Sequence, residues 1–158
     1  MEKIKTGLAA FGMSGQIFHA PFISTNPAFC LTAITERNKN LSKERYPSAR
    51  IVRSFEELVA LDELELVVIN TPDSTHYEYT RKALEAGKNV LCEKAFTVNA
   101  DQARKLFALA KEKNLLITEA IWTRYMPSRK MIDDIISSGV IGEVTAVTAN
   151  LNYAISEV

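Results

Sequence analysis

Short apolar runs alternate with helix-like segments along most of this 158-residue chain, and this alternation constrains the fold more than any other feature. The runs are nearly continuous in apolar residues, which is typical of strands that are covered on both faces of a sheet. Strands joined by helices form right-handed βαβ units and therefore a parallel sheet. Six strands are expected, at residues 4–10, 29–35, 51–52, 64–70, 89–92 and 115–118.

The segments between these runs carry the signals that begin and end helices. Residues 54–57 and 99–102 form capping boxes, in which a side-chain oxygen at the helix start is followed three positions later by Glu or Gln. Gly87 and Gly139 each follow a helix-like segment, where glycine commonly ends a helix. These signals predict an α/β fold with a doubly wound parallel sheet over residues 1–120. We expect the Rossmann form of such a sheet, with strand order 3-2-1-4-5-6.

The alternation breaks after residue 120. A helix is expected from Pro127 to about Ser138, and residues 142–153 alternate like an antiparallel strand with one face in solvent. We therefore expect a second unit over residues 121–158, made of a connecting helix and the first strand of a truncated α+β domain. A strand without its sheet has an unpaired edge, so dimerisation or aggregation through residues 143–153 is expected.

Composition excludes several classes of protein. The 19 Lys and Arg balance the 19 Asp and Glu, so no basic excess is present and no nucleic-acid partner is expected. No apolar run approaches the roughly 20 residues of a membrane span, and the first residues lack the apolar core of a signal peptide. Cys30 and Cys92 are expected to be buried free thiols. We therefore expect a cytoplasmic protein with no membrane partner and no metal site.

The first strand leads into a glycine turn that is suited to a pyrophosphate. The turn contains Phe11, Gly12, Met13 and Gly15, while Ala10 stands where the usual fingerprint has its first glycine. Gly12 lets the backbone approach a phosphate, Gly15 allows close packing of helix against strand, and the helix start offers free N–H groups. The turn can also be purely structural. The residues that follow the other strands decide between the two interpretations.

Glu36 and Arg37 follow the second strand, where sheets of this kind bind the adenosine ribose of a dinucleotide. Glu36 favours NAD, because a carboxylate repels a 2′-phosphate. Arg37 favours NADP, because a guanidinium can pair with that phosphate. A solvated charge pair at a strand end is the alternative interpretation. Together the two residues favour NAD slightly.

Further polar residues follow the fourth and fifth strands, at the switch point of the sheet where ligands bind. After the fourth strand, His76 is a candidate base or a structural residue at a helix start. His19, near the glycine turn, is expected to be a packing or capping residue. After the fifth strand, Lys94 beside Glu93 can hydrogen-bond a substrate hydroxyl in a closed cleft, or it is an ordinary solvated lysine.

The order of these motifs resembles the Gfo/Idh/MocA family of NAD(P)-dependent oxidoreductases. The motifs are Gly-x-x-Gly, then Thr-Pro-x-x-x-His, then Ala-Gly-Lys-x-Val-x-x-Glu-Lys, and the resemblance covers almost the whole chain. Residues 93–97 and 119–124, followed by Pro127, resemble the branch with dimeric dihydrodiol dehydrogenase and NADP-linked D-xylose dehydrogenase. The resemblance implies hydride transfer between a nicotinamide and the CH–OH of a sugar, polyol or dihydrodiol substrate.

The resemblance also implies which residues bind the dinucleotide. In chain order they are Phe11, Gly12, Met13, Gly15, Glu36, Arg37, Asn70, Thr71, Pro72, His76, Glu93, Lys94, Trp122 and Arg124. The first four would form the pyrophosphate turn and the next two would lie beside the adenosine ribose. The following four would line or support the adenine–pyrophosphate side, and the last four would approach the nicotinamide. Lys94 would be the catalytic residue, acting as general acid/base or polarising the substrate.

Four departures from the family pattern change what is expected. Ala95 stands where the family usually has proline, so a trans bond is expected between Lys94 and Ala95. Ala10 replaces the first glycine of the turn, and Glu36 does not suit the NADP preference of the branch. Family members are about twice as long, with a second domain that closes the substrate pocket and forms much of a dimer interface.

The shorter length implies that this chain alone binds dinucleotide but turns over poorly or not at all. In the complete protein, a homodimer or higher oligomer is expected. A sensing or regulatory module that binds a dinucleotide or sugar without catalysis is an alternative, and a cofactor-free scaffold is a third.

Overall fold

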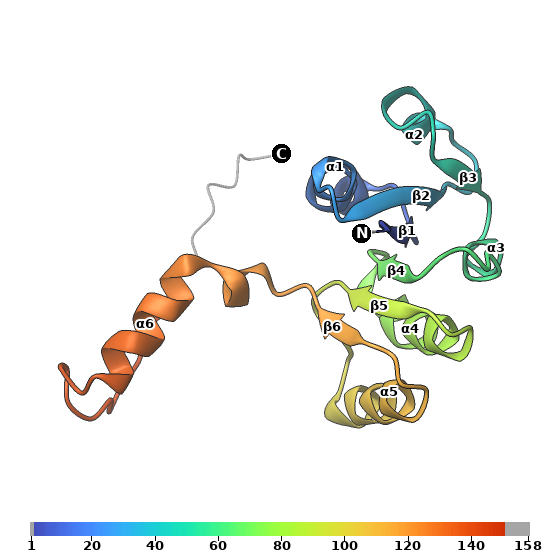
Figure 1. The fold of residues 1–158 in the computed structure, drawn as a ribbon. Coiled ribbons are helices and arrows are strands. Elements are labelled where there is room, and N and C mark those ends of the chain that lie inside the picture. The colour runs from blue at the N-terminus through green and yellow to red at the C-terminus, as the bar shows by residue number, and fades with distance from the viewer. Residues whose placement is uncertain (1, 151–158) are drawn as a thin grey trace, which may run out of the picture. The chain divides into compact units, whose positions relative to one another are not determined.

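The computed structural model describes residues 2–150, and its first unit is a six-stranded parallel sheet with helices on both faces (Figure 1). The strand order is β3-β2-β1-β4-β5-β6, so the predicted doubly wound topology is confirmed. The strands are β1 (Ile4–Leu8), β2 (Phe29–Thr35), β3 (Arg50–Val52), β4 (Leu66–Ile69), β5 (Asn89–Cys92) and β6 (Ile117–Glu119). All five neighbouring pairs are parallel, so the carboxyl ends of the strands share one edge of the sheet.

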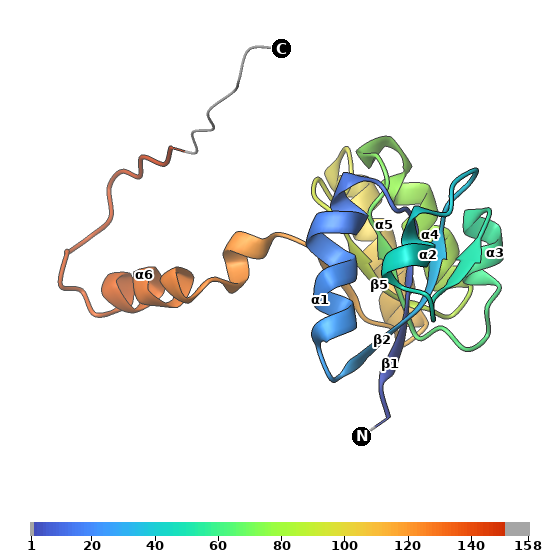
Figure 2. The same ribbon diagram turned by 90° about the horizontal axis from the view of Figure 1, so that it is seen from above.

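Two apolar layers hold the helices of this unit against the sheet. Figure 2 shows the sheet and its helices from above. The helical segments are η1 (Gly15–His19, a π-helical turn), α1 (Ala20–Thr25), α2 (Leu41–Arg45), α3 (Phe55–Val59), η2 (Asp73–Thr75), α4 (His76–Glu85) and α5 (Ala100–Glu112). Leu8 and Val68 pack with α1 on one face, while Val67 and Ile69 pack with α3, α4 and α5 on the other. Alternate residues of a strand point to opposite faces, so nearly continuous apolar strands fill both layers.

The residues that were predicted to begin and end helices do so in the structure. Ser54 Oγ accepts a hydrogen bond from Glu57 N at 3.0 Å, and Asn99 Oδ1 accepts one from Gln102 N at 2.9 Å. Gly87 follows α4 with a φ of +75°, a conformation that glycine adopts without a Cβ clash. These local interactions set where α3, α4 and α5 begin or end.

The two cysteines differ in exposure, and the expectation that both are buried is wrong for Cys30. Cys92 is fully buried on β5, and burial raises the pKa of its thiol to about 12. Cys30 is exposed. It lies near the start of β2, before the stretch Ala33–Thr35 that pairs with β3, so less of the fold covers it. The Cys92 thiol is therefore protonated and unreactive at neutral pH.

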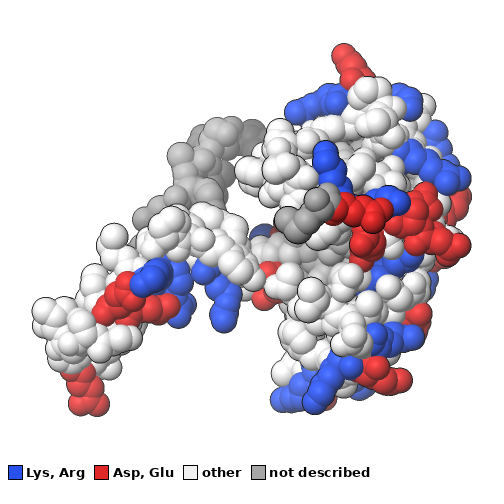
Figure 3. Space-filling view, in the orientation of Figure 1, with Lys and Arg blue, Asp and Glu red and all other residues white. Residues whose placement is uncertain are grey.

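Charged side chains of both signs are intermixed on the face of the molecule shown in Figure 3. No single-sign patch dominates that face, in keeping with the formal net charge of +0. Within residues 2–150, no helix is long and apolar enough to cross a membrane.

A second unit begins at Ile121, after a first unit that ends at Ala120. It contains η3 (Trp122–Tyr125) and α6 (Pro127–Ser137), and none of the residues of α6 is buried. The strand predicted over residues 142–153 is not found in the part that is described, since residues 144–150 have no regular structure. A strand needs a hydrogen-bonded neighbour, and every described strand pairs within the first unit. Residues 151–153 lie outside the described residues.

Candidate functional site

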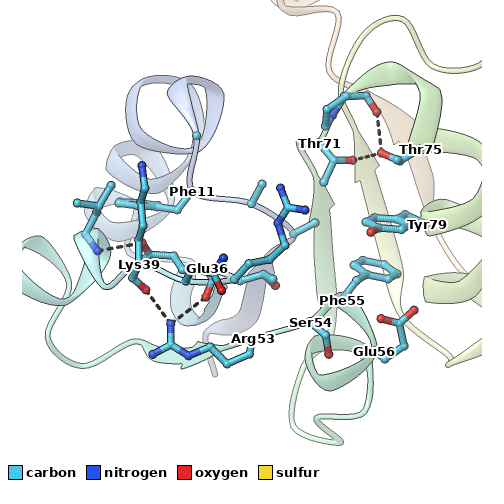
Figure 4. A pocket seen from close by; sticks show the side chains of 18 of the residues that line it. Phe11, Glu36, Lys39, Arg53, Ser54, Phe55, Glu56, Thr71, Thr75 and Tyr79 are labelled. Carbon is cyan, nitrogen blue, oxygen red and sulfur yellow. Dashed lines mark hydrogen bonds between the residues drawn. The ribbon is translucent and has the colours of Figure 1, made fainter.

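A cavity of about 760 Å³ opens at the carboxyl ends of β1, β2, β3 and β4 in the first unit (Figure 4). Its volume is in the range of sites that bind small molecules and cofactors. The structure brings together in its walls six of the predicted residues, Phe11, Gly12, Glu36, Arg37, Thr71 and Pro72. The other predicted residues of the first unit do not line this cavity; they are Met13, Gly15, Asn70, His76, Glu93 and Lys94. Trp122 and Arg124 belong to η3 of the second unit, and their part in the site stays a prediction.

The glycine turn is held by a pair of hydrogen bonds from one side chain at the end of β4. Asn70 Nδ2 donates to the Ala10 carbonyl oxygen at 2.8 Å, and Ala10 N donates to Asn70 Oδ1 at 3.0 Å. Gly15 faces this pair so closely that a Cβ there would lie 2.5 Å from the Ala10 oxygen. A Cβ on Gly12 would meet no atom of the chain within 4 Å. Gly15 is therefore required by the fold, whereas Gly12 leaves open space beside the cavity.

Glu36 lies in the cavity wall, but its carboxylate is occupied by the start of α2. Glu36 Oε2 accepts from Leu41 N at 2.9 Å, and Oε1 accepts from Ser42 N at 2.9 Å and from Ser42 Oγ at 2.5 Å. Only 6% of the residue is exposed. Burial by itself raises the pKa of Glu36, but the hydrogen bonds from Ser42 and Leu41 and the charge of Arg53 outweigh it and hold the pKa below its ordinary value. Glu36 is therefore ionised and serves as the cap of α2.

Because of these contacts, Glu36→Gln is expected to lower the free energy of unfolding at pH 7 by about 1–3 kcal/mol. The folded-state pKa of Glu36 lies below the ordinary 4.5, so its stabilising contribution is present above pH 4.5 and is lost as the pH falls below that value. The difference between wild type and variant should therefore shrink in acid. Urea unfolding at several pH values measures it, with Glu44→Gln, an exposed change on the same helix, as control. Equal effects of the two variants at pH 7 would contradict the capping role.

Arg53, just after β3, fixes the loop that carries Glu36. Arg53 Nη1 donates to the carbonyl oxygens of Glu36 at 2.9 Å and Lys39 at 2.7 Å, and Nη2 donates to Asn40 Oδ1 at 2.7 Å. Figure 4 shows Glu36, Lys39 and Arg53 together on one side of the pocket. The guanidinium thus ties β3 to the whole loop between β2 and α2.

The opposite side of the cavity is built by residues that the sequence did not single out. Phe55 of α3 and Tyr79 of α4 stack with ring centroids 4.0 Å apart, and both line the cavity. Thr71 Oγ1 lies 2.7 Å from Thr75 Oγ1 beside them (Figure 4). Sequence reasoning missed four residues of the cavity wall, because the sequence shows only that they lie near strand or helix ends. They are Lys39, Arg53, Phe55 and Tyr79. No fingerprint spacing marks them.

Glu93 connects the end of β5 to the helix that follows the glycine turn. Its Oε1 accepts from His19 Nε2 at 2.8 Å and from Ser14 Oγ at 3.2 Å, and its Oε2 accepts from Lys94 N at 3.1 Å. His19 is 7% exposed. The sequence predicted only packing or capping for His19, and its pairing with Glu93 could not be read from residues 74 positions apart. This contact fixes the start of the Glu93-Lys94 loop against the turn.

Lys94 is exposed, and within residues 2–150 its Nζ has no hydrogen-bond partner. The expectation of a trans bond between Lys94 and Ala95 is wrong, because this bond is cis. The segment that follows is held on both sides, since the Ala95 carbonyl oxygen lies 2.7 Å from His76 Nδ1 and Phe96 N donates to Glu119 Oε1 at 2.9 Å. These contacts fix the backbone on the far side of Lys94, while its exposed side chain is left available to a ligand.

His76 is only 1% exposed, and both of its ring nitrogens face backbone oxygens. Nδ1 lies 2.7 Å from the Ala95 oxygen and Nε2 lies 2.9 Å from the Thr71 oxygen. No ring nitrogen is left for a substrate proton, so this placement favours the structural alternative over the catalytic base. His76 joins the segments that follow β4 and β5.

Comparison with known proteins agrees with this geometry. Residues 4–120 match the GFO_IDH_MocA model, described as an oxidoreductase family with an NAD-binding Rossmann fold. The D-xylose 1-dehydrogenase (NADP(+)) of Hypocrea jecorina is 51% identical over 104 residues, which are 66% of this chain and 27% of that protein. The match to the family model therefore covers the first unit from residue 4 to its end at Ala120.

Solved structures share the same fold. A protein from Bacteroides fragilis is 57% identical with a TM-score of 0.81, over 89% of this chain and 42% of that one. The 3-ketoreductase KijD10 from Actinomadura kijaniata, solved with NADP and TDP-benzene, is 30% identical with a TM-score of 0.84, over 90% of this chain and 44% of that one. The chain spans less than half the length of each of these relatives.

Proposed function

We propose that this chain, which belongs to the Gfo/Idh/MocA family of oxidoreductases with an NAD-binding Rossmann fold, is the NAD(P)-binding part of a dehydrogenase or reductase. The reaction would move a hydride between the nicotinamide and the CH–OH carbon of a sugar, polyol or dihydrodiol. The observation that carries the proposal is the cavity at the carboxyl edge of the sheet, bounded by an open glycine turn and by the loop after β2.

Three features of the cavity support a bound dinucleotide. The open space beside Gly12 leaves room for a pyrophosphate to approach the backbone, as a side chain would not. Thr35 Oγ1, in the cavity wall, is buried and lacks a hydrogen-bond partner among the described residues. The stacked pair of Phe55 and Tyr79 offers an apolar wall. Phe11, Gly12, Met13 and Gly15 would form the pyrophosphate turn, with Thr71 and Pro72 on the far side.

The chemistry divides between the cofactor and the residues after β5. When bound, the nicotinamide would accept the hydride from the substrate carbon in one direction of the reaction and donate it in the other. Lys94 is proposed to hydrogen-bond the substrate oxygen and to handle or stabilise its proton, because its Nζ is exposed and unpartnered within the described residues. Glu93, held by His19 and Ser14, keeps the loop of Lys94 at the edge of the sheet. Asn70 and His76 would act by holding the turn and the loop in place.

The proposed partners are a small hydroxylated substrate and further copies of the chain. The name of the Hypocrea relative, a D-xylose dehydrogenase, supports a sugar substrate. Helix α6 has no buried residue, and its apolar side chains Met131, Ile132, Ile135 and Ile136 are free to pack on another surface, which supports a homodimer or higher oligomer. A free thiol at Cys92 fits a reducing compartment, and we propose the cytoplasm.

Titration of this chain with NADH and NADPH tests the proposed function. We expect an increase in nicotinamide fluorescence that saturates, with a dissociation constant between about 1 μM and 1 mM for at least one of the two. A nucleotide that binds should also raise the melting temperature, because a ligand that binds only the folded state stabilises it. Absence of binding to both nucleotides would refute the proposal and favour the scaffold alternative.

A further inference from the structure

We propose that His19 is a positioning residue of the reaction. Through the Glu93 carboxylate it fixes the backbone of Lys94, and so the place from which the Lys94 amine meets the substrate. The inference rests on the proposed function, since it needs Lys94 to act on a substrate oxygen. It assigns His19 a role beyond the packing or capping that the sequence predicted.

His19 ends the π-helical turn η1, which follows the glycine turn. In η1, Ala20 N donates to the oxygen of Gly15, five residues back. The next residue, Pro21, has no N–H and cannot make the α-helical bond to the residue four positions back. The extra residue of a π turn changes the direction of its side chains, and such turns are rare but frequent at functional sites. Here the turn ends with the His19 ring against Glu93, just after β5.

The Glu93 carboxylate is the point at which the glycine turn and the loop of Lys94 meet. Its Oε1 accepts from His19 Nε2 at 2.8 Å and from Ser14 Oγ at 3.2 Å, and its Oε2 accepts from Lys94 N at 3.1 Å. A carboxylate can only accept, so the proton of the shortest contact lies on His19 Nε2. The side chains of His19 and Glu93 are 8% and 16% exposed, so little water can replace this donor.

Removal of the His19 donor would free the Glu93 side chain. Among the described residues it would keep two longer hydrogen bonds, from Ser14 Oγ and Lys94 N. A largely buried carboxylate that lacks a donor is costly, so the side chain would turn towards water and release the Lys94 amide. The backbone beyond Lys94 has its own partners and would stay in place. The near side of Lys94 is therefore held through Glu93.

The dinucleotide pocket would stay intact without this donor. His19 does not line the cavity, and the glycine turn is held independently by the two hydrogen bonds between Asn70 and Ala10. The loss of the donor should therefore act on the placement of Lys94 rather than on nucleotide binding. A displacement of about 1 Å in a reacting group can lower a rate about a hundredfold.

A double-mutant cycle in the complete oxidoreductase tests the inference. His19→Leu should lower kcat about 10–100-fold and leave the KM for the nucleotide within about threefold. In a Lys94→Ala background the same change should lower kcat less than about threefold, because a positioning residue has no effect once the group that it positions is gone.

Two amide variants separate the donor from the rest of the His19 side chain. The amide N–H of His19→Gln lies as many bonds from the backbone as Nε2, so this variant should keep kcat within about threefold of wild type. The amide of His19→Asn is one bond shorter and does not reach Glu93, so this variant should lose kcat like His19→Leu. It takes the place of His19→Leu if the apolar variant does not fold.

Hydrogen exchange of the Lys94 amide adds a readout that needs no turnover. The exchange rate should rise about tenfold or more in His19→Leu and stay near the wild-type rate in His19→Gln. Ser24→Ala is the matched control, because Ser24 is exposed on α1 and donates to the Pro21 oxygen at 3.0 Å. It should leave both kcat and the exchange rate within about twofold.

The outcomes separate the inference from the proposed function. An unchanged kcat in His19→Leu, an equal loss of kcat with and without Lys94, or an unchanged exchange rate of the Lys94 amide overturns the inference while the proposed function stands. An unchanged kcat in Lys94→Ala contradicts the proposed role of Lys94, and the inference fails with it. Binding of neither nucleotide overturns the proposed function itself.

Discussion

Gly15→Ala is expected to lower the free energy of unfolding by about 1–3 kcal/mol and to weaken dinucleotide binding at the same time. The added Cβ would lie 2.5 Å from the Ala10 carbonyl oxygen and 2.8 Å from Asn70 Nδ2. Both atoms belong to the hydrogen-bonded pair that shapes the turn, so neither can move without breaking it. The turn must therefore open, and the N–H groups that would meet a pyrophosphate move with it. Urea unfolding and nucleotide titration measure the two effects.

Gly12→Ala is the matched control for this prediction, because the same methyl group meets no chain atom within 4 Å. Its free energy of unfolding should change by less than about 0.5 kcal/mol. Its dinucleotide affinity should nevertheless fall about tenfold or more, since the methyl group occupies the space through which a pyrophosphate approaches. If Gly12→Ala binds like wild type, the pyrophosphate does not pass this residue and the assignment of the turn is wrong.

The contrast between the two glycines shows what the sequence could predict. Strand and helix signals lie within a few residues of one another, and the handedness of βαβ units leaves few topologies, so a doubly wound parallel sheet could be predicted from local patterns. The strand order 3-2-1-4-5-6 was expected because it is that of the Rossmann form of such a sheet. The turn was recognised for the same reason. The sequence also predicted close packing at Gly15 and open space at Gly12, but it did not show that Asn70, just after β4, is the side chain that holds the turn against Gly15.

The roles of charged residues were less predictable than their positions. Glu36 was placed correctly at the end of β2, but an acid there can bind a ribose or cap the next helix, and spacing does not distinguish the two. The choice is made by Ser42, six residues later, whose N and Oγ both reach the carboxylate. The pair of His19 and Glu93 joins segments 74 residues apart, and the sequence carries no signal for it. Local patterns predict elements, whereas long-range contacts decide what each polar group does.

Lys94→Ala should lower the kcat of the complete oxidoreductase by about 10²–10⁴-fold, the usual contribution of a positioned acid or base. Lys94 follows β5 at the carboxyl edge of the sheet, and its neighbour Glu93 is fixed by His19 and Ser14. Its own Nζ has no partner in the described part of the chain, so it is available to a substrate oxygen. Steady-state kinetics with the preferred nucleotide and a series of sugars and diols measures the loss.

Two further variants decide how Lys94 acts and whether the chain is catalytic at all. Lys105→Ala, an exposed change on α5, is the control and should leave kcat within about twofold. Lys94→Arg keeps the positive charge but cannot release a proton near neutral pH, so partial activity would indicate polarisation of the substrate oxygen and full loss would indicate proton transfer.

A Lys94→Ala variant with unchanged kcat would contradict the catalytic role. A complete protein that binds nucleotide and sugar but turns over neither would support the sensing alternative, because a sensor needs the pocket but not the proton-handling lysine.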